Sequence, residues 1–157
     1  MADSMVLGHL STIGGMRDVR IRCDRNAVGK PLSGWNKKQI GRFGEDLAAF
    51  YLEQCGLRIL NRNWTCRFGE ADIVAEDDKE IVLVEVKTRN IQRTDGDVAP
   101  ELAVNSQKRR RYEKMALMYL ANCAERTDVR FDVIAICLLD EHESYLRHLA
   151  GAYEWDD

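Results

Sequence analysis

The chain has 157 residues, of which 45% are hydrophobic, enough for one folded domain with a sizeable core. Its net charge of -3 excludes a global attraction to nucleic acid or anionic membranes, so any such affinity must come from a local patch. No stretch approaches the length of a membrane span, and the N-terminus lacks the order typical of a signal peptide. We therefore expect a soluble, cytoplasmic protein.

The five cysteines are odd in number and show neither a C-x-x-C motif nor Cys/His ligand spacing. This pattern argues against a zinc site and against a disulfide framework. Cys55, Cys123 and Cys137 fall inside apolar segments, which predicts buried, reduced thiols of a cytosolic protein.

Residues 1–33 show no sustained periodicity, and we interpret them as a flexible N-terminal extension. Within them, the run from Val19 to Arg22 could add a short strand. The remaining residues, 34–157, are expected to form the folded domain. Function is expected in this second part of the chain.

The first helix is predicted to begin after Asn36, which with Gln39 resembles a capping box, and to end at Gly56. Gly41 and Gly44 lie inside this helix, and each costs about 1 kcal/mol relative to alanine. Such a cost suggests that another backbone approaches the helix closely.

Glu45 lies off the apolar stripe of this helix, among small neighbours. On an ordinary amphipathic helix its carboxylate would be solvated. The small neighbours leave a second packed side equally open at this point.

A strand is predicted over residues 57–66, followed by a hairpin whose strand-like segments are 69–74 and 82–87. The polar turn between them contains Asp78 and Lys79. A two-residue loop at these positions would place Asp72 opposite Glu85, and Glu70 opposite Lys87. All four side chains would then share one face of the sheet, with paired Cβ atoms about 4.5–5.5 Å apart.

Two carboxylates this close, Asp72 and Glu85, repel each other unless one is protonated or a cation binds. Oxygen ligands suit hard cations such as Mg²⁺ or Mn²⁺ better than zinc. The alternative is a solvated cross-strand Glu/Lys pair beside two ordinary carboxylates. Both interpretations stay open from the pattern alone.

A loop follows from Asn90 to about Ala103 and could act as a lid beside the carboxylates. The second helix begins near Asn105, and its first turns are strongly basic because they carry Lys108, Arg109, Arg110 and Arg111. Positive charge at a helix N-terminus opposes the macrodipole unless an anion is nearby. A phosphate backbone would supply that anion, whereas the alternative is a solvated basic face.

Two final strands are predicted over residues 131–139 and 145–149. The element order is therefore α-β-β-β-α-β-β. The hairpin strands are apolar on both faces in their middle, so helices should cover both sides of the sheet. We predict an α/β fold with a mixed central β-sheet flanked by helices.

Asp72, then twelve intervening residues, then Glu85-Val86-Lys87 resembles the active-site pattern of the PD-(D/E)-x-K nuclease superfamily, with Ala71 at the proline position. The element order is similar to the restriction-endonuclease-like core. More narrowly, residues 41–152 resemble the YraN family of uncharacterised bacterial proteins, itself similar to archaeal Holliday-junction resolvases. The segments that carry this resemblance are Gly41-Arg42-Phe43-Gly44-Glu45, Asn63-Trp64, Gly69-Glu70-Ala71-Asp72, Glu85-Val86-Lys87-Thr88-Arg89, Ala103-Val104 with Lys108, and Arg130-Phe131-Asp132-Val133.

This resemblance implies catalytic roles for Glu45, Asp72, Glu85 and Lys87. Asp72 and Glu85 would bind Mg²⁺ or Mn²⁺, and Glu45 would approach the ion directly or through water. Lys87 would orient the attacking water or stabilise the charged transition state. Glu70 would support Lys87 from the facing strand.

The resemblance also implies a surface that holds the phosphate backbone without reading sequence. Lys108 is the first candidate for this contact, and Arg89, Arg110 and Arg111 are weaker ones. The segment from Asn90 to Leu102 follows the family pattern only loosely, so the resemblance does not define further substrate contacts.

The predicted function is a Mg²⁺- or Mn²⁺-dependent nuclease that hydrolyses phosphodiester bonds of DNA, with branched or structured DNA as one candidate substrate. Resolvase-like action on a symmetric junction would call for a homodimer. Two alternatives remain: a nucleic-acid-binding protein with this fold and little catalysis, and a protein-interaction domain in which the charged hairpin is merely structural.

Overall fold

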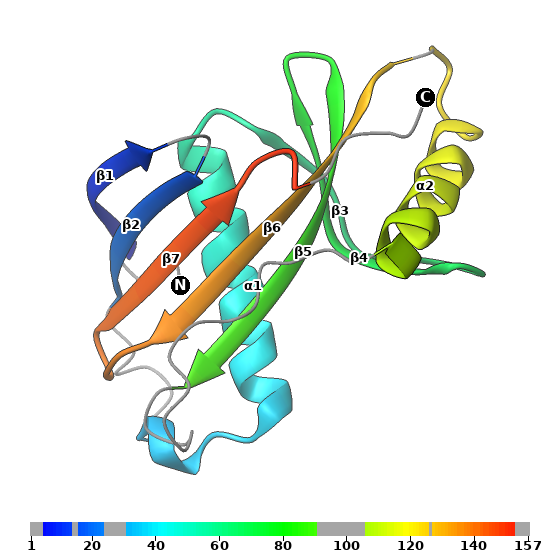
Figure 1. The fold of residues 1–157 in the computed structure, drawn as a ribbon. Coiled ribbons are helices and arrows are strands. Elements are labelled where there is room, and N and C mark those ends of the chain that lie inside the picture. The colour runs from blue at the N-terminus through cyan, green and yellow to red at the C-terminus, as the bar shows by residue number, and fades with distance from the viewer. Residues whose placement is uncertain (1–4, 14–15, 24–30, 91–105, 126, 153–157) are drawn as a thin grey trace.

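A computed structural model describes residues 5–13, 16–23, 31–90, 106–125 and 127–152 (Figure 1). Its elements in chain order are β1 (Met5–Ile13), β2 (Met16–Cys23), the 3-10 turn η2 (Leu32–Gly34), α1 (Lys37–Gln54), β3 (Arg58–Cys66), β4 (Gly69–Asp77), β5 (Glu80–Asn90), α2 (Ser106–Leu120), β6 (Val129–Leu138) and β7 (Glu143–Leu149). The predicted lid after Asn90 lies outside the described residues.

The described strands form one seven-stranded sheet in the order β1-β2-β7-β6-β5-β4-β3. Strands β5 and β6 are parallel, and the other neighbouring strands are antiparallel. Figure 1 shows α1 behind this sheet and α2 beside β4. The predicted mixed α/β sheet with flanking helices is confirmed, and the arrangement is consistent with a restriction-endonuclease-like fold.

The N-terminal region differs from the sequence-based expectation of a flexible extension over residues 1–33. Strand β2 pairs with β7 over seven registered positions, from Met16 opposite Leu149 to Arg22 opposite Glu143, and β1 pairs with β2. Val19 and Ile21 are 1% exposed because they cover apolar core beside α1. The expectation is corrected for residues 5–13 and 16–23, and the suggested strand from Val19 to Arg22 is confirmed as part of β2.

The first helix has the predicted limits. The Asn36 side chain accepts a hydrogen bond from the Gln39 amide at 2.8 Å, and the Gln39 side chain accepts one from the Asn36 amide at 3.0 Å. Helix α1 ends at Gln54, and Gly56 then takes a φ of 91°, a conformation that glycine adopts without a Cβ penalty. The capping box and the glycine stop are therefore both confirmed.

Two apolar cores lie on opposite faces of the sheet. In β5, Val82 and Val84 belong to the core under α1, whereas Ile81 and Leu83 belong to the core under α2. Because side chains alternate along a strand, this division puts the two helices on opposite faces. The central strands are thus covered on both sides, as their apolar runs predict.

The hairpin between β4 and β5 has the predicted two-residue loop. Asp78 and Lys79 have φ values of 46° and 75°, as a tight hairpin turn of the primed type requires. The resulting register pairs Ile73 with Val84 and Val74 with Leu83. This register fixes which residues of β5 face α2.

All five cysteines are free thiols, and Cys137 is buried as predicted while Cys55 and Cys123 are half-buried. Among the helices in the described part of the chain, none is both long enough and apolar enough to cross a membrane.

Candidate active site

The candidate site lies where β4 and β5 separate. The β4–β5 ladder runs from the turn to the pair Ile73 and Val84, one position before Asp72 and Glu85 would face each other. Beyond that point the Asp72 side chain, rather than its backbone, bonds to β5: its Oδ2 accepts a hydrogen bond from the Val86 amide at 2.7 Å. The expected pairing of Asp72 with Glu85 is therefore replaced by a side-chain bridge between the strands.

Asp72 is partly buried and surrounded by like charges. Burial is the main cause that raises its pKa from 3.8 to about 6, and the Val86 hydrogen bond opposes it. The carboxylates of Glu45, Glu85 and Glu70 raise the pKa further. These four acidic residues therefore share one electrostatic environment, in which a bound cation would relieve the repulsion.

Glu85 is held by two side chains of α2. The Tyr112 hydroxyl donates a hydrogen bond to Oε2 at 2.6 Å, and Lys108 Nζ lies 3.8 Å from Oε1. Glu85 therefore lies on the α2 face of the sheet. Sequence reasoning missed this contact, because helical spacing can predict a buried tyrosine ring but not the position of its hydroxyl.

Glu45 reaches the site because α1 lies against β5. A Cβ at Gly44 would overlap the side chain of Thr88, so glycine permits this close approach, whereas Gly41 has open space around it. Burial raises the pKa of Glu45, with Arg62 and a hydrogen bond from Asn63 opposing this effect. The partly packed alternative for Glu45 is thus confirmed.

Lys87 and Arg89 follow Glu85 at alternate positions of a regular strand, so they share its face of the sheet. Lys87 is registered with Ala135, and Arg89 with Cys137 of the neighbouring strand. Glu70 is exposed and is near enough to raise the pKa of Asp72. Its support of Lys87 stays a prediction.

The basic residues of α2 border the same site. Lys108 contacts Glu85, and the Arg111 guanidinium lies 5.5 Å from the centre of the Tyr112 ring. Arg111 also passes Gly69, where a Cβ would come within 3.4 Å of its Cδ. Arg110 is exposed to solvent. Of the predicted phosphate-contacting residues of the helix, Lys108 therefore lies beside a carboxylate and Arg111 beside Tyr112 and Gly69, whereas Arg110 faces solvent.

The acidic residues suit one class of ion better than others. Over the described residues, no three His, Cys, Asp or Glu side chains are close enough together to hold an ion by themselves. Mg²⁺ commonly uses only one or two carboxylates and completes its shell with water and substrate phosphates. Asp72 and Glu85 fit that pattern, since each carboxylate keeps oxygen lone pairs beyond its hydrogen bonds.

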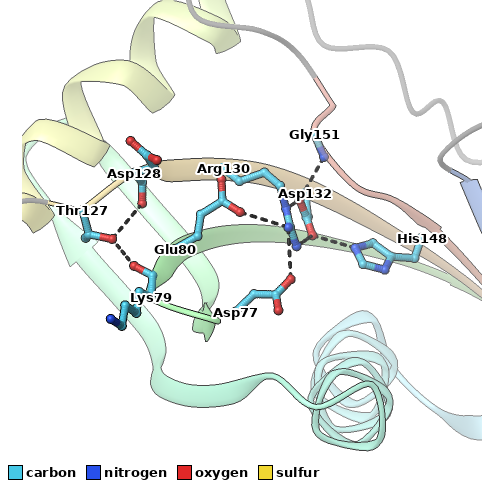
Figure 2. Close-up of polar contacts among 9 residues, drawn as sticks. All are labelled: Asp77, Lys79, Glu80, Thr127, Asp128, Arg130, Asp132, His148 and Gly151. Carbon is cyan, nitrogen blue, oxygen red and sulfur yellow. Dashed lines mark hydrogen bonds and ion pairs between the residues drawn. The ribbon is translucent and has the colours of Figure 1, made fainter.

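A second polar cluster, shown in Figure 2, lies on the α1 face of the sheet. Arg130 donates to Asp132 through Nε at 2.8 Å and Nη2 at 3.1 Å, and its Nη1 contacts Asp77 and Glu80. Asp132 Oδ2 also lies 2.7 Å from His148 Nε2. We call Arg130, Asp132, His148 and Tyr51 the buried network, because the Tyr51 hydroxyl completes it at 2.9 Å from His148 Nδ1.

Within the buried network, the Asp132 carboxylate is compensated by hydrogen bonds from Arg130 and His148. Burial alone would raise the pKa of Asp132, but the hydrogen bonds from His148 and Arg130 outweigh it and lower the pKa. The amide of Gly151 adds a further donor at 3.0 Å. The sequence indicated Asp132 only as part of a motif, and the contact with His148 joins residues that no local pattern links.

Comparison with known proteins places these residues in a defined group. The family model described as "Uncharacterised protein family UPF0102" matches residues 44–136. A UPF0102 protein of Geobacter sulfurreducens is 47% identical over 120 residues, covering 76% of this chain and 91% of the relative. A UPF0102 protein of Mycobacterium sp. (strain JLS) is 42% identical over 124 residues, covering 77% and 90%. The matched span contains Glu45, Asp72, Glu85, Lys87 and Asp132, whereas β1, β2 and β7 lie outside it.

Proposed function

This chain belongs to the UPF0102 family, whose description states no activity, and we propose that it is a Mg²⁺- or Mn²⁺-dependent nuclease acting on DNA. The proposal rests on the geometry at the separation of β4 and β5. There, Asp72 and Glu85 lie among further carboxylates, and Lys87 follows Glu85 on the same face of the strand.

The observation that carries the proposal is the electrostatic excess at Asp72. Three other carboxylates raise its pKa, while the hydrogen bond from the Val86 amide is what opposes them among the described residues. A structural ion pair would have matched this charge with a nearby cation, as the buried network does for Asp132. An acidic group left in this state inside a sheet is typical of a functional site.

The residues of the site divide the chemistry among them. A bound divalent ion would lower the pKa of a water molecule and offset the charge of the scissile phosphate. Asp72 and Glu85 would hold that ion, and Glu45 would approach it directly or through water. Lys87 would place its ammonium against the phosphate oxygens, where negative charge grows in the transition state.

The basic start of α2 supports a polyanionic substrate. Lys108, Arg110 and Arg111 lie on the helix that contacts Glu85, so a bound backbone would run past the carboxylates. Such contacts hold phosphates without reading base sequence. Arg89, on the strand that carries Lys87, is a further candidate for the same role.

The test is a nicking assay with purified protein on linear, flapped and four-way DNA and on matched RNA, across a titration of Mg²⁺ and Mn²⁺. We expect metal-dependent cleavage of DNA that is lost in the double variant Asp72→Ala and Lys87→Ala. The matched control is Glu53→Ala, which removes an exposed carboxylate near the end of α1 and should leave cleavage unchanged.

Other outcomes identify the alternatives. Salt-sensitive DNA binding without cleavage at any metal concentration would indicate a nucleic-acid-binding protein. If neither binding nor a metal-induced rise in melting temperature occurs, the charged hairpin is structural and the proposal is wrong. Cleavage that persists in the double variant would remove the assigned site.

A further inference from the structure

Tyr112 joins the apolar core to the carboxylate site. The residue is 6% exposed, and its ring packs against Phe131, with ring centroids 5.4 Å apart. Its hydroxyl ends at Glu85 Oε2, 2.6 Å away. The position of this hydroxyl is therefore set by the core rather than by solvent.

The contact is a short, directional hydrogen bond to a charged acceptor. Bonds from a hydroxyl to a carboxylate typically span about 2.5–2.7 Å and are roughly twice as strong as neutral ones. The phenol is the donor and an ionised Glu85 the acceptor. One oxygen of Glu85 is thereby fixed in place, while the other retains its lone pairs.

Lys108 meets the other oxygen of Glu85 in a different way. Its ammonium lies 3.8 Å from Oε1, beyond hydrogen-bond distance, and its side chain is 29% exposed. Lys108 precedes Tyr112 by one helical turn, so the two side chains stand next to each other on α2. The Tyr112 hydroxyl thus holds Oε2 by a short hydrogen bond, whereas the Lys108 ammonium lies near Oε1 without a hydrogen bond to it.

We propose that Tyr112 is a positioning residue for the metal ligand Glu85, holding Oε2 so that Oε1 is presented to a divalent cation. This inference rests on the proposed function, because it assigns a role within that same site. Residues that orient a metal ligand in this way commonly contribute about 10- to 100-fold to metal affinity or activity. Lys108 would leave Oε1 when the cation arrives.

The test compares Mn²⁺ binding to the wild type, Tyr112→Phe and Tyr119→Phe, followed by electron paramagnetic resonance of free Mn²⁺ without nucleic acid. Tyr112→Phe keeps the buried ring and removes the hydroxyl. Tyr119→Phe is the matched control, because its hydroxyl donates at 2.8 Å to Asn61, outside the carboxylate site. We expect Mn²⁺ affinity to fall about 10-fold in Tyr112→Phe and to stay unchanged in Tyr119→Phe.

A second readout separates positioning from general damage. In the nicking assay, Tyr112→Phe should raise the Mg²⁺ concentration for half-maximal rate by a similar factor, while saturating Mg²⁺ restores the rate. Wild-type Mn²⁺ affinity in Tyr112→Phe, or an equal loss in both variants, would overturn the positioning role and leave the proposed function intact. A wild type that neither binds Mn²⁺ nor nicks DNA at any metal concentration would overturn both.

Discussion

Two aspartates of the sheet, the buried Asp132 on β6 and the partly buried Asp72 on β4, have opposite electrostatic surroundings. Asp132 has no exposed side-chain surface, yet its pKa is lowered, because His148 and Arg130 outweigh the cost of burial. Asp72 is less buried, yet its pKa rises to about 6, because burial and three carboxylates outweigh one amide donor. The degree of burial alone therefore does not decide the direction of the pKa shift. The hydrogen-bonding and charged groups around each aspartate decide it.

The comparison separates a charge that the surrounding residues stabilise from one that they disfavour. In the buried network, each charged group has a hydrogen-bonding partner within the fold. Removing one partner would leave a buried charge without compensation. At Asp72, burial and three neighbouring carboxylates disfavour the ionised form, and among the described residues the Val86 amide opposes them. A bound divalent cation would relieve this repulsion.

The largest expected effect is on stability, from Asp132→Asn. It removes the charge that pairs with Arg130 and His148 and should lower the free energy of unfolding by about 3–5 kcal/mol. Urea denaturation followed by circular dichroism measures this loss. The control is Asp18→Asn, whose partner Arg147 binds it in the same two-point manner at 2.9 and 3.3 Å, but with 26% of the aspartate side chain exposed.

We expect less than about 1 kcal/mol from that exposed pair. If the two asparagine variants lose equal stability, burial and pairing do not distinguish the network from an ordinary surface ion pair.

The next effect is on rate, from Lys87→Met. The variant keeps much of the side-chain length and removes the ammonium, so nicking should slow about 100-fold or more, as when one transition-state donor is lost. Mn²⁺ affinity should stay within a few-fold of wild type, because Lys87 is not a ligand. Lys38→Met, at an exposed position on the first turn of α1, is the control. Equal nicking in both variants would remove Lys87 from the mechanism.

The hairpin was predictable because its information is local. A polar two-residue turn between apolar runs determines the register, and the register determines which side chains share a face with Glu85. The capping box at Asn36 and the glycine at position 56 are local in the same sense. Local signals of this kind are sufficient to predict that Glu85 and Lys87 share one face of β5.

Other contacts depend on distant parts of the chain and were not predictable. The pairing of β2 with β7 joins residues about 125 positions apart, and no pattern within residues 16–23 identifies that partner. The Tyr51–His148 contact joins residues 97 positions apart and was unpredictable for the same reason. The alternation of apolar and polar residues also could not predict that the β4–β5 ladder ends before Asp72, because that end depends on the hydrogen bond from the Val86 amide to the Asp72 side chain.

A smaller effect with the opposite sign is expected for Asp72→Asn in the metal-free protein. At pH 7.5 the ionised Asp72 costs stability, because its folded pKa of about 6 exceeds the ordinary 3.8. Asparagine can still accept the Val86 hydrogen bond, so the free energy of unfolding should rise by about 1–2 kcal/mol after allowance for solvent screening.

The pH dependence gives the sign of this effect. As the pH falls through about 6, folded wild type takes up the proton that its unfolded state does not yet bind, so its stability approaches that of the variant. Urea titrations at several pH values measure this convergence. Glu76→Gln, which breaks the exposed contact with Arg58 at 2.8 Å, should show no gain at pH 7.5. A destabilised Asp72→Asn would mean that the site is a satisfied structural cluster.

The smallest effect is expected at the rim of the site, from Arg110→Gln and Arg111→Gln. Each removes one positive charge from the start of α2, so DNA binding should weaken without a change in the Mn²⁺ affinity of the carboxylates. If each arginine neutralises one phosphate, the slope of log affinity against log salt should fall by about 0.9 per substitution on duplex DNA. Arg22→Gln, exposed on β2 and separated from β5 by two strands, is the control for net charge alone. An equal fall for Arg22 would mean that DNA responds to overall charge, whereas a fall confined to α2 would place the backbone beside Glu85 and Lys87.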